Sequence, residues 1–269
     1  MMHLLSENIQ KITEQAGGTW GIVLEDLDRN AKWEWHADET FYAASVIKVP
    51  IMIAAYEALE KNEISFSDKI PLKREELVGG SGVLQHITPG TELTIYDLIV
   101  LMIIQSDNTA TNMLIDLLGA EKIQNTMNNY GWTSSTCFNK LMTIPVERKG
   151  NNMITAGDMA LMLKQMVTGK LISVHASEEM ISIMKKQQIS DALPGKLPSP
   201  EHENIGGRPA WELAHKTGTI TNVQHDVGIF YVGQRTLIAT ILAKDIDNYQ
   251  LLATFQDIGL EIYNYLKSN

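Results

Sequence analysis

The sequence predicts an α+β fold in which one five-stranded sheet carries the two terminal helices and a helical block fills the middle of the chain. Strand-like runs gather near the two ends, whereas apolar residues between about 45 and 210 recur mainly at helical spacing. The chain has 269 residues, of which 44% are hydrophobic, so it can bury a core for one large domain or two lobes.

The first element is predicted to be a helix that precedes the sheet. Four aliphatic residues between positions 4 and 12 recur at helical spacing, and the pair Gly17-Gly18 ends the helix. The segment TWGIVLEDLD then indicates a strand, RN its turn, and AKWEWH a second strand in which aromatic and polar residues alternate. Two strands therefore open the sheet as a hairpin.

The middle of the chain is predicted to form helices joined by loops. Thr94 is a candidate N-cap, because its hydroxyl precedes the apolar run IYDLIVLMII. The expected helices cover residues 45–61, 94–105, 108–118, 121–129, 155–168 and 176–188. The segment DALPGKLPSPEHENIGGRPA is rich in proline and glycine, so we expect a long surface loop that returns the chain to the sheet.

Three further strands and a final helix are predicted after residue 210. The runs WELAHKTGT, VGIFYVG and RTLIATILAK are strand-like, and NYQLLATFQDIGLEIYNYLK is amphipathic. We therefore expect an α/β lobe made of residues 1–44 and 211–269, and a helical lobe made of residues 45–210. The two lobes would form a single unit, and the cleft between them is the expected ligand site.

The composition argues against several classes of function. The chain has 22 lysines and arginines against 32 acidic residues, and its net charge of -10 opposes binding to nucleic acid. Cys137 is the only cysteine, so a disulfide framework and a thiolate zinc cluster are excluded. No run approaches the roughly 18 apolar residues of a membrane helix, and the N-terminus lacks the pattern of a secretory signal. We expect a cytoplasmic monomer with no membrane or nucleic-acid partner.

The stretch FYAASVIKVP carries the first hypothesis about chemistry. Ser45 precedes Lys48 by three residues, so the two side chains would be neighbours on a helix that begins at Ser45. A lysine amine can take the proton of a serine hydroxyl when burial and nearby positive charge lower its pKa. Alternatively, Ser45 is an ordinary N-cap and Lys48 extends into water.

Spacing alone does not decide between these interpretations, because the segment SIMK has the same spacing. Its Ser182 and Lys185 lie in EEMISIMKKQQI, where the apolar residues suit a core helix and the lysines should be solvated. We therefore expect this second pair to be structural.

Two downstream motifs distinguish the first pair. Ser106, Asp107 and Asn108 lie between two predicted helices, and the run HKTGT ends a predicted strand. Each motif also has an ordinary structural interpretation, as a helix cap or as an edge strand that runs into a turn. Together, and in this order, the three motifs resemble those of the penicillin-recognising serine hydrolases, most closely the class A β-lactamases.

The resemblance extends over nearly the whole chain, and it includes GSGVLQHITPG before the second motif and TATN after it. It implies a β-lactamase-like three-layer α/β/α sandwich with a five-stranded antiparallel sheet plus an all-helical subdomain. We expect no cofactor, and the histidine and carboxylate spacings favour no metal site.

The resemblance also implies roles for individual residues. Ser45 would be the nucleophile that β-lactams acylate, and Lys48 the group that activates it. Ser106 would relay a proton to the leaving nitrogen. Asn108 would bind a side-chain carbonyl of the substrate, and Asp107 would hold the loop.

In the third motif, Lys216 and Thr217 would receive the substrate carboxylate, and the charge of Lys216 would lower the pKa of Lys48. Gly218 would leave room for the substrate against the strand. The backbone N–H groups of Ser45 and Thr219 would form the oxyanion hole, where each donor contributes about 3 to 4 kcal/mol in a comparable enzyme.

The chain departs from class A β-lactamases in the loop between the second and third motifs, where that class carries the glutamate that primes the deacylating water. Different anchors place Cys137, Asn139 or a residue near Met142 at this position, and none is a carboxylate. Glu147 is acidic, but a neighbouring basic side chain is its more natural partner.

Three outcomes follow from the missing glutamate. A positioned general base accelerates a step on the order of 100-fold to 10,000-fold, so without one the acyl-enzyme should persist. The protein is then a slow β-lactamase in which Lys48 also deacylates, or it prefers a D-alanyl peptide or an ester, or it binds β-lactams as a sensor without turnover. His215 and His225 flank the third motif, and the pair His225-Asp226 would orient a strand edge or line the cleft. A structural role for these histidines is favoured over metal binding.

Overall fold

The computed structural model describes residues 1–142, 150–200 and 209–268, and its centre is a five-stranded antiparallel sheet. The strand order is β2-β1-β9-β8-β7, which leaves β7 at one edge. The strands are β1 (Thr19–Asp26), β2 (Ala31–Trp35), β7 (Trp211–Ile220), β8 (Val223–Val232) and β9 (Arg235–Lys244). The predicted five-stranded sheet is confirmed, with its first two strands joined as a hairpin.

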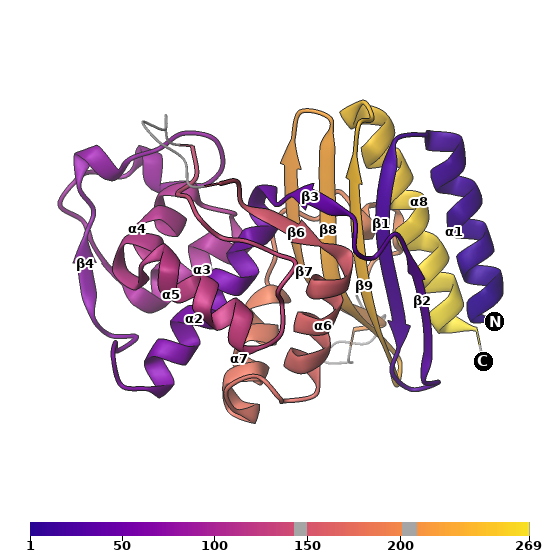
Figure 1. The fold of residues 1–269 in the computed structure, drawn as a ribbon, viewed down its shortest axis with the longest axis horizontal. Coiled ribbons are helices and arrows are strands. Elements are labelled where there is room, and N and C mark those ends of the chain that lie inside the picture. Colours follow the sequence, from indigo (N-terminus) through magenta and orange to yellow (C-terminus); the bar gives the residue numbers. More distant parts are fainter. Residues whose placement is uncertain (143–149, 201–208, 269) are drawn as a thin grey trace.

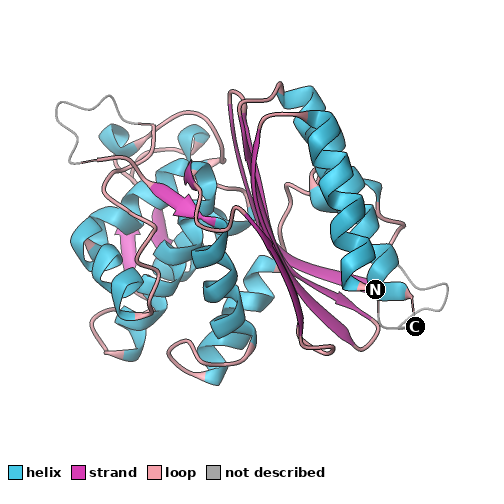
Figure 2. Ribbon diagram, turned by 45° about the vertical axis from the view of Figure 1, so that its right-hand side comes forward, coloured by secondary structure: helices cyan, strands magenta, loops and turns pink. Residues whose placement is uncertain are grey.

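The two faces of the sheet are covered by different helices, as Figure 2 shows. Helices α1 (Met2–Ala16) and α8 (Asn248–Lys267) pack together on one face, around a core that includes Ile9, Leu24 and Phe255. On the other face, α6 (Ala156–Val167) lies against β1 and β9 (Figure 1). The chain therefore forms the predicted three layers, because each sheet face presents apolar side chains that need a cover.

The middle of the chain is helical except for two short ribbons that the sequence does not predict. The remaining α-helices are α2 (Lys48–Glu60), α3 (Ile95–Ile104), α4 (Asn108–Leu118), α5 (Ala120–Asn129) and α7 (Val174–Met184). Strand β3 (Thr40–Tyr42) pairs with β6 (Met153–Thr155), and β4 (Lys69–Pro71) pairs with β5 (Glu92–Thr94). Strands of three residues are too short for a period-2 alternation to register in the sequence, so the expectation of an all-helical block is wrong in this respect.

Side-chain caps fix several helix starts near their predicted positions. Thr94 accepts a hydrogen bond from the Asp97 N–H, and Asp97 in turn accepts one from the Thr94 N–H, which forms a capping box for α3. Ser173 caps α7, which begins and ends earlier than the predicted 176–188. Beyond its end, the Gln188 N–H donates to the Ile104 carbonyl rather than to a carbonyl of α7. A tertiary hydrogen bond therefore competes with further helix extension.

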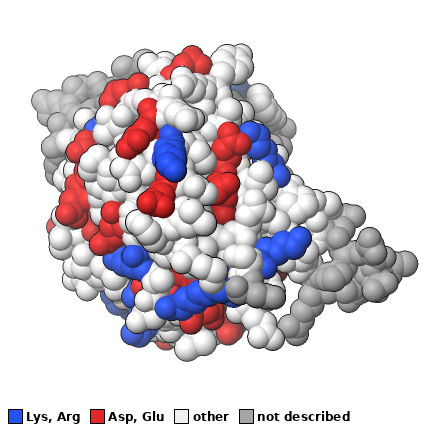
Figure 3. Space-filling view, turned by 90° about the vertical axis from the view of Figure 1, so that its right-hand side faces the viewer, with Lys and Arg blue, Asp and Glu red and all other residues white. Residues whose placement is uncertain are grey.

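Acidic and basic side chains are interspersed on the side of the molecule shown in Figure 3. None of the described helices is both long and apolar enough to span a bilayer. The predicted loop DALPGKLPSPEHENIGGRPA, which precedes β7, contains a short 3-10 helix, η4 (Leu193–Lys196). Part of that loop, residues 201–208, lies outside the described residues.

Candidate active site

Ser45 lies in a 3-10 turn, η1 (Ala44–Ile47), and not at the start of an α-helix as the sequence suggests. Helix α2 follows directly and begins at Lys48. In a 3-10 helix, side chains three residues apart eclipse one another. This geometry brings the Ser45 hydroxyl to 3.1 Å from Lys48 Nζ. The hydroxyl makes no capping bond, so the N-cap interpretation of Ser45 is wrong.

The Lys48 amine is enclosed by oxygen atoms from the segment that joins α3 to α4. Its side chain is fully buried. Nζ lies 2.5 Å from the Ser106 carbonyl oxygen, 3.0 Å from Ser106 Oγ and 2.8 Å from Asn108 Oδ1. Ser106 adopts a left-handed backbone conformation, with φ of 53°, in the turn that presents both of its oxygens to the amine. The alternative in which Lys48 extends into water is therefore wrong.

Asp107 holds this turn in place from behind. Its carboxylate caps α4 by accepting from the Ala110 N–H at 2.9 Å. The same carboxylate accepts from the N–H groups of Val83 and Leu84 at 2.7 and 2.8 Å, which ties the preceding loop to the turn. Asp107 therefore acts as a structural brace for its two neighbours.

The contacts of Lys48 are compatible with a neutral amine. Two of its four oxygen contacts, the Ser106 carbonyl and Asn108 Oδ1, can only accept hydrogen bonds, so they take two N–H donors. A neutral amine then directs its lone pair at a hydroxyl, either that of Ser45 or that of Ser106. Burial is the largest cause that lowers the pKa of Lys48, and the charge of Lys216 lowers it further, against an opposing effect of Asp107.

Lys216 reaches the same hydroxyl from the edge strand β7. Its Nζ lies 3.1 Å from Ser106 Oγ and 2.8 Å from the Thr217 carbonyl oxygen, and its side chain is fully buried. Burial lowers the pKa of Lys216 to about 7, while the charge of Asp226 acts in the opposite direction. Ser106 Oγ is therefore shared by two amines, one from each side.

The backbone of β7 passes directly against the start of η1 at Gly218. A Cβ on Gly218 would lie 3.0 Å from the Ser45 nitrogen and 3.1 Å from the Val46 nitrogen. Thr217 before it is buried, and Thr219 after it is exposed. The structure thus brings Ser45, Lys48 and the Ser106–Asn108 turn together with Lys216 and Gly218 of the edge strand.

If Ser45 is the nucleophile that the motifs imply, Gly218→Ala should slow its acylation about tenfold, because even a fraction of an ångström of misplacement weakens a positioned site. The added methyl group is tighter against the backbone than normal packing allows, so η1 and β7 must separate by a few tenths of an ångström. Acylation rate and melting temperature should be measured on the same samples. A loss of rate that merely follows a loss of folded protein would contradict this explanation.

The described part of the loop after α5 is anchored through amide side chains. Cys137 is buried, and burial raises the pKa of its thiol to about 12. Asn139 donates to the Gly150 carbonyl at 2.5 Å, and Asn152 accepts from the Asn139 N–H at 3.0 Å. Neither candidate position therefore presents a base to Ser45. Glu147 lies outside the described residues.

The sequence reasoning misses Asn112, which connects this loop to the site. Its Oδ1 accepts from the Leu141 N–H at 2.7 Å, and its Nδ2 donates to the Leu141 carbonyl at 2.8 Å. Asn112 lies one turn beyond Asn108 on α4, so the Leu141 backbone is fixed beside the face that contacts Lys48. Met142 follows, next to Gly80 and thus close to Asn108. The spacing of Asn108 and Asn112 in NTATN is the signal that could have indicated this contact.

The remaining candidates have contacts outside this site. Lys185 of the second serine-lysine pair forms an ion pair with Glu212 at 2.8 Å. His215 contacts Asp226, with 2.8 Å between Nδ1 and Oδ1. His225 Nε2 lies 2.9 Å from the Tyr42 carbonyl. Within the described ranges, no cluster of three or more histidine, cysteine or acidic side chains could hold a metal ion.

Comparison with known proteins agrees with this arrangement. A family model described as the beta-lactamase enzyme family matches residues 4–266. A beta-lactamase of Rhodobacter capsulatus is 26% identical over 247 residues, which cover 90% of this chain and 81% of the relative. The crystal structure of a beta-lactamase from Sphaerobacter thermophilus DSM 20745 is 30% identical, with a TM-score of 0.87 and coverage of 97% of this chain and 96% of that one.

A second kind of neighbour is PBP-A, which is 25% identical, with a TM-score of 0.85 and coverage of 98% of this chain and 96% of that one. Its leucine-to-glutamate mutant, an acyl-enzyme complex with penicillin G, matches equally well. The fold and these relatives define a serine hydrolase of the β-lactamase or PBP-like type. The chain belongs to the beta-lactamase enzyme family.

Proposed function

We propose that Ser45 is acylated by β-lactams or related acyl donors that bear a carboxylate, and that the acyl group is released slowly. The observation that carries this proposal is the buried Lys48 amine, which contacts the hydroxyls of both Ser45 and Ser106. A buried lysine with a purely structural role would need an acidic partner. Here, instead, a second lysine, Lys216, contacts the same Ser106 hydroxyl.

In the acylation step, Ser45 Oγ attacks the carbonyl carbon of the substrate while its proton passes to Lys48 Nζ. The oxyanion is received by the N–H groups of Ser45 and Thr219, since the first N–H groups of a helical turn and the outer N–H groups of an edge strand have no partner of their own. The ring C–N bond then breaks. The leaving nitrogen takes the proton of Ser106, and the Lys48 ammonium restores it.

Substrate recognition would use the remaining residues of the motifs. Lys216 and Thr217 would bind the carboxylate of the substrate, and Asn108 would donate to its side-chain carbonyl through Nδ2, which now donates to the Gly79 carbonyl at 3.0 Å. Gly218 lets the substrate approach the strand. The partner is thus a small molecule, and we propose that the protein acts on it as a monomer.

Slow release follows from what surrounds the loop position fixed by Asn112. The residue held there is Leu141, which cannot activate water, and the two other candidate positions carry a thiol and an amide. Lys48 remains as a possible base. The alternative function is that of a non-hydrolysing penicillin-binding protein, or of a D-alanyl peptidase or esterase of the same fold. The structural similarity to PBP-A supports this alternative.

Incubation with a chromogenic cephalosporin, followed by both absorbance and intact mass, tests the proposal. We expect one rapid equivalent of product, a covalent adduct on the protein, and slow turnover afterwards. A burst with a permanent adduct would favour the penicillin-binding alternative. If neither product nor adduct appears, the proposed acylation is wrong.

The second-order rate of acylation should depend on pH through both lysines. It should rise as Lys48 loses its proton, and it should fall as pH increases through about 7, where the free protein loses the Lys216 charge that receives the carboxylate. A substrate without a carboxylate should not show the falling limb. A falling limb of equal size for both substrates would contradict the assignment to Lys216.

A further inference from the structure

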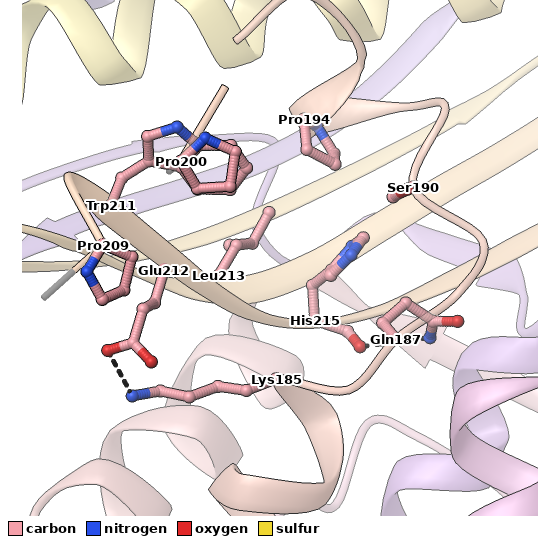
Figure 4. A pocket seen from close by; sticks show the side chains of 10 residues that line it. All are labelled: Lys185, Gln187, Ser190, Pro194, Pro200, Pro209, Trp211, Glu212, Leu213 and His215. Atoms are coloured by element: carbon pink, nitrogen blue, oxygen red, sulfur yellow. Dashed lines mark hydrogen bonds and ion pairs between the residues drawn. The ribbon is translucent and has the colours of Figure 1, made fainter. Parts of the chain in front are cut away.

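A cavity lies beside the first half of β7, on the strand that carries Lys216 but around its upstream residues. Its volume is about 320 Å³. Figure 4 shows the side chains that line it, among them Pro194, Trp211, Leu213 and His215. Because successive side chains of a strand point to opposite faces, His215 and Lys216 serve different spaces. The cavity is therefore separate from the site around Ser45.

Among the polar side chains that line this cavity, His215 is paired with a buried aspartate, Asp226. His215 is only 3% exposed and Asp226 is fully buried, with 2.8 Å between Nδ1 and Oδ1. The other oxygen of Asp226 accepts from the Leu193 N–H at 3.2 Å, which ties η4 to the pair. In the neutral ring, the Nδ1–H donates to the Asp226 carboxylate and Nε2 carries the lone pair. Among the described residues, Nε2 has no hydrogen-bond partner.

His225, which precedes Asp226 on the neighbouring strand β8, shows the opposite arrangement. Its Nε2 lies 2.9 Å from the Tyr42 carbonyl, and its Nδ1 accepts from the Ala243 N–H at 3.3 Å. Both ring nitrogens are therefore used by the backbone. His225 has a structural role, whereas His215 retains one nitrogen for a ligand.

The chain leaves space for the His215 ring. Gly228 is its cross-strand partner, and a Cβ on Gly228 would lie 2.6 Å from the His215 Cβ and 2.8 Å from the Ala214 carbonyl oxygen. The cavity wall is held as well, since the Trp211 indole donates to the Pro198 carbonyl at 2.8 Å. The ring and its apolar surroundings are thus positioned before any ligand arrives.

The chemistry of the cavity selects its ligand. Trp211, Leu213 and Pro194 offer apolar and aromatic surface, and His215 Nε2 offers one hydrogen-bond acceptor. The Asp226 carboxylate behind the ring opposes an anion. At the rim, Glu212 is already neutralised by Lys185 at 2.8 Å, as the dashed line in Figure 4 marks.

We propose that this cavity is a second small-molecule site, which binds a small aromatic hydrogen-bond donor such as a phenol through Nε2 of His215. The donor O–H or N–H meets the lone pair of Nε2, and the aromatic ring packs against Trp211 and Leu213. The site is independent of acylation at Ser45, so it goes beyond the function proposed above.

Titration of histidine-labelled protein with phenol, followed by nitrogen NMR of the imidazole rings, tests this proposal. Phenol should shift the His215 Nε2 resonance in a saturable manner and leave the His225 resonances unmoved. Toluene, which lacks the donor, and benzoate, which is an anion, should bind roughly tenfold more weakly or worse, the loss expected for one hydrogen bond of about 1.4 kcal/mol.

Three variants make the outcome decisive. His215→Phe should weaken phenol binding roughly tenfold by removing the same hydrogen bond. Ser190→Trp should block the cavity from its rim while it leaves the histidine-aspartate pair intact. Ser45→Ala should bind phenol as the unmodified protein does. Equal binding of toluene, an unshifted His215, or loss of binding in Ser45→Ala would each overturn the proposal.

Discussion

Ser45→Ala should abolish the covalent adduct with penicillin or cephalosporin completely, as measured by intact mass. The substitution removes the attacking oxygen and leaves Lys48 with its other three contacts, the two oxygens of Ser106 and Asn108 Oδ1. The buried turn should therefore stay folded. Removal of a catalytic nucleophile costs on the order of a millionfold in rate in a comparable serine hydrolase, far beyond any effect of altered packing.

Ser182→Ala is the matched control, because Ser182 has the same spacing to a lysine but lies on an exposed part of α7. Its lysine, Lys185, pairs with Glu212 and lies over the ring of Tyr231. Adduct formation should be unchanged in this variant. If Ser182→Ala removed the adduct and Ser45→Ala retained it, the nucleophile would have been assigned to the wrong pair.

Leu141→Glu should accelerate release of the acyl group on the order of 100-fold, since a positioned general base contributes at least that much. The double hydrogen bond from Asn112 fixes the Leu141 backbone, and Asn112 shares a helix face with Asn108, which contacts Lys48. A carboxylate introduced there is attached to a backbone held against the helix face that contacts Lys48, so we expect it to reach the acyl group proposed for Ser45. Decay of the penicillin adduct, followed by intact mass over time, gives the rate directly.

Asn139→Glu is the control for this change, because position 139 was one of the places that alignment of the loop suggested. Its side chain is directed to the Gly150 carbonyl, and Asn152 holds its backbone. A glutamate there should leave release slow. Equal acceleration by both variants would mean that a general effect of added charge, and not a base at the Asn112-anchored position, speeds deacylation.

The sequence predicts the elements in which a hydrophobic pattern repeats over many residues or in which a side chain caps a helix. The strands of the central sheet and the helix capped by Thr94 are of this kind. It does not predict the three-residue ribbons, or the 3-10 turn at Ser45, since both are shorter than one period of any pattern and depend on tertiary contacts. The turn matters most, because it sets the distance between Ser45 and Lys48.

The site was predicted as a set of residues, and the structure adds their connections. Motif spacing indicates that Ser45, Ser106 and Lys216 belong together, but it contains no information about which hydroxyl lies between the two amines. Counting residues from the neighbouring motifs does not locate the glutamate position in this loop, because a difference in loop length moves the position obtained from each motif. Position 141 is identified by the Asn112 side chain, which forms hydrogen bonds with both the N–H and the carbonyl of Leu141.

The pair of amines around Ser106 also has a consequence for the protein as a folding unit. Burial lowers the pKa of both Lys48 and Lys216 in the folded chain, whereas in the unfolded chain both have ordinary lysine values. The unfolded chain therefore holds more protons at neutral pH, and proton linkage makes folding less favourable as pH falls from the unfolded lysine pKa toward the folded values. The two buried lysines therefore reduce the free energy of unfolding at neutral pH. Burial of the two apolar cores, one on each face of the sheet, must offset this loss.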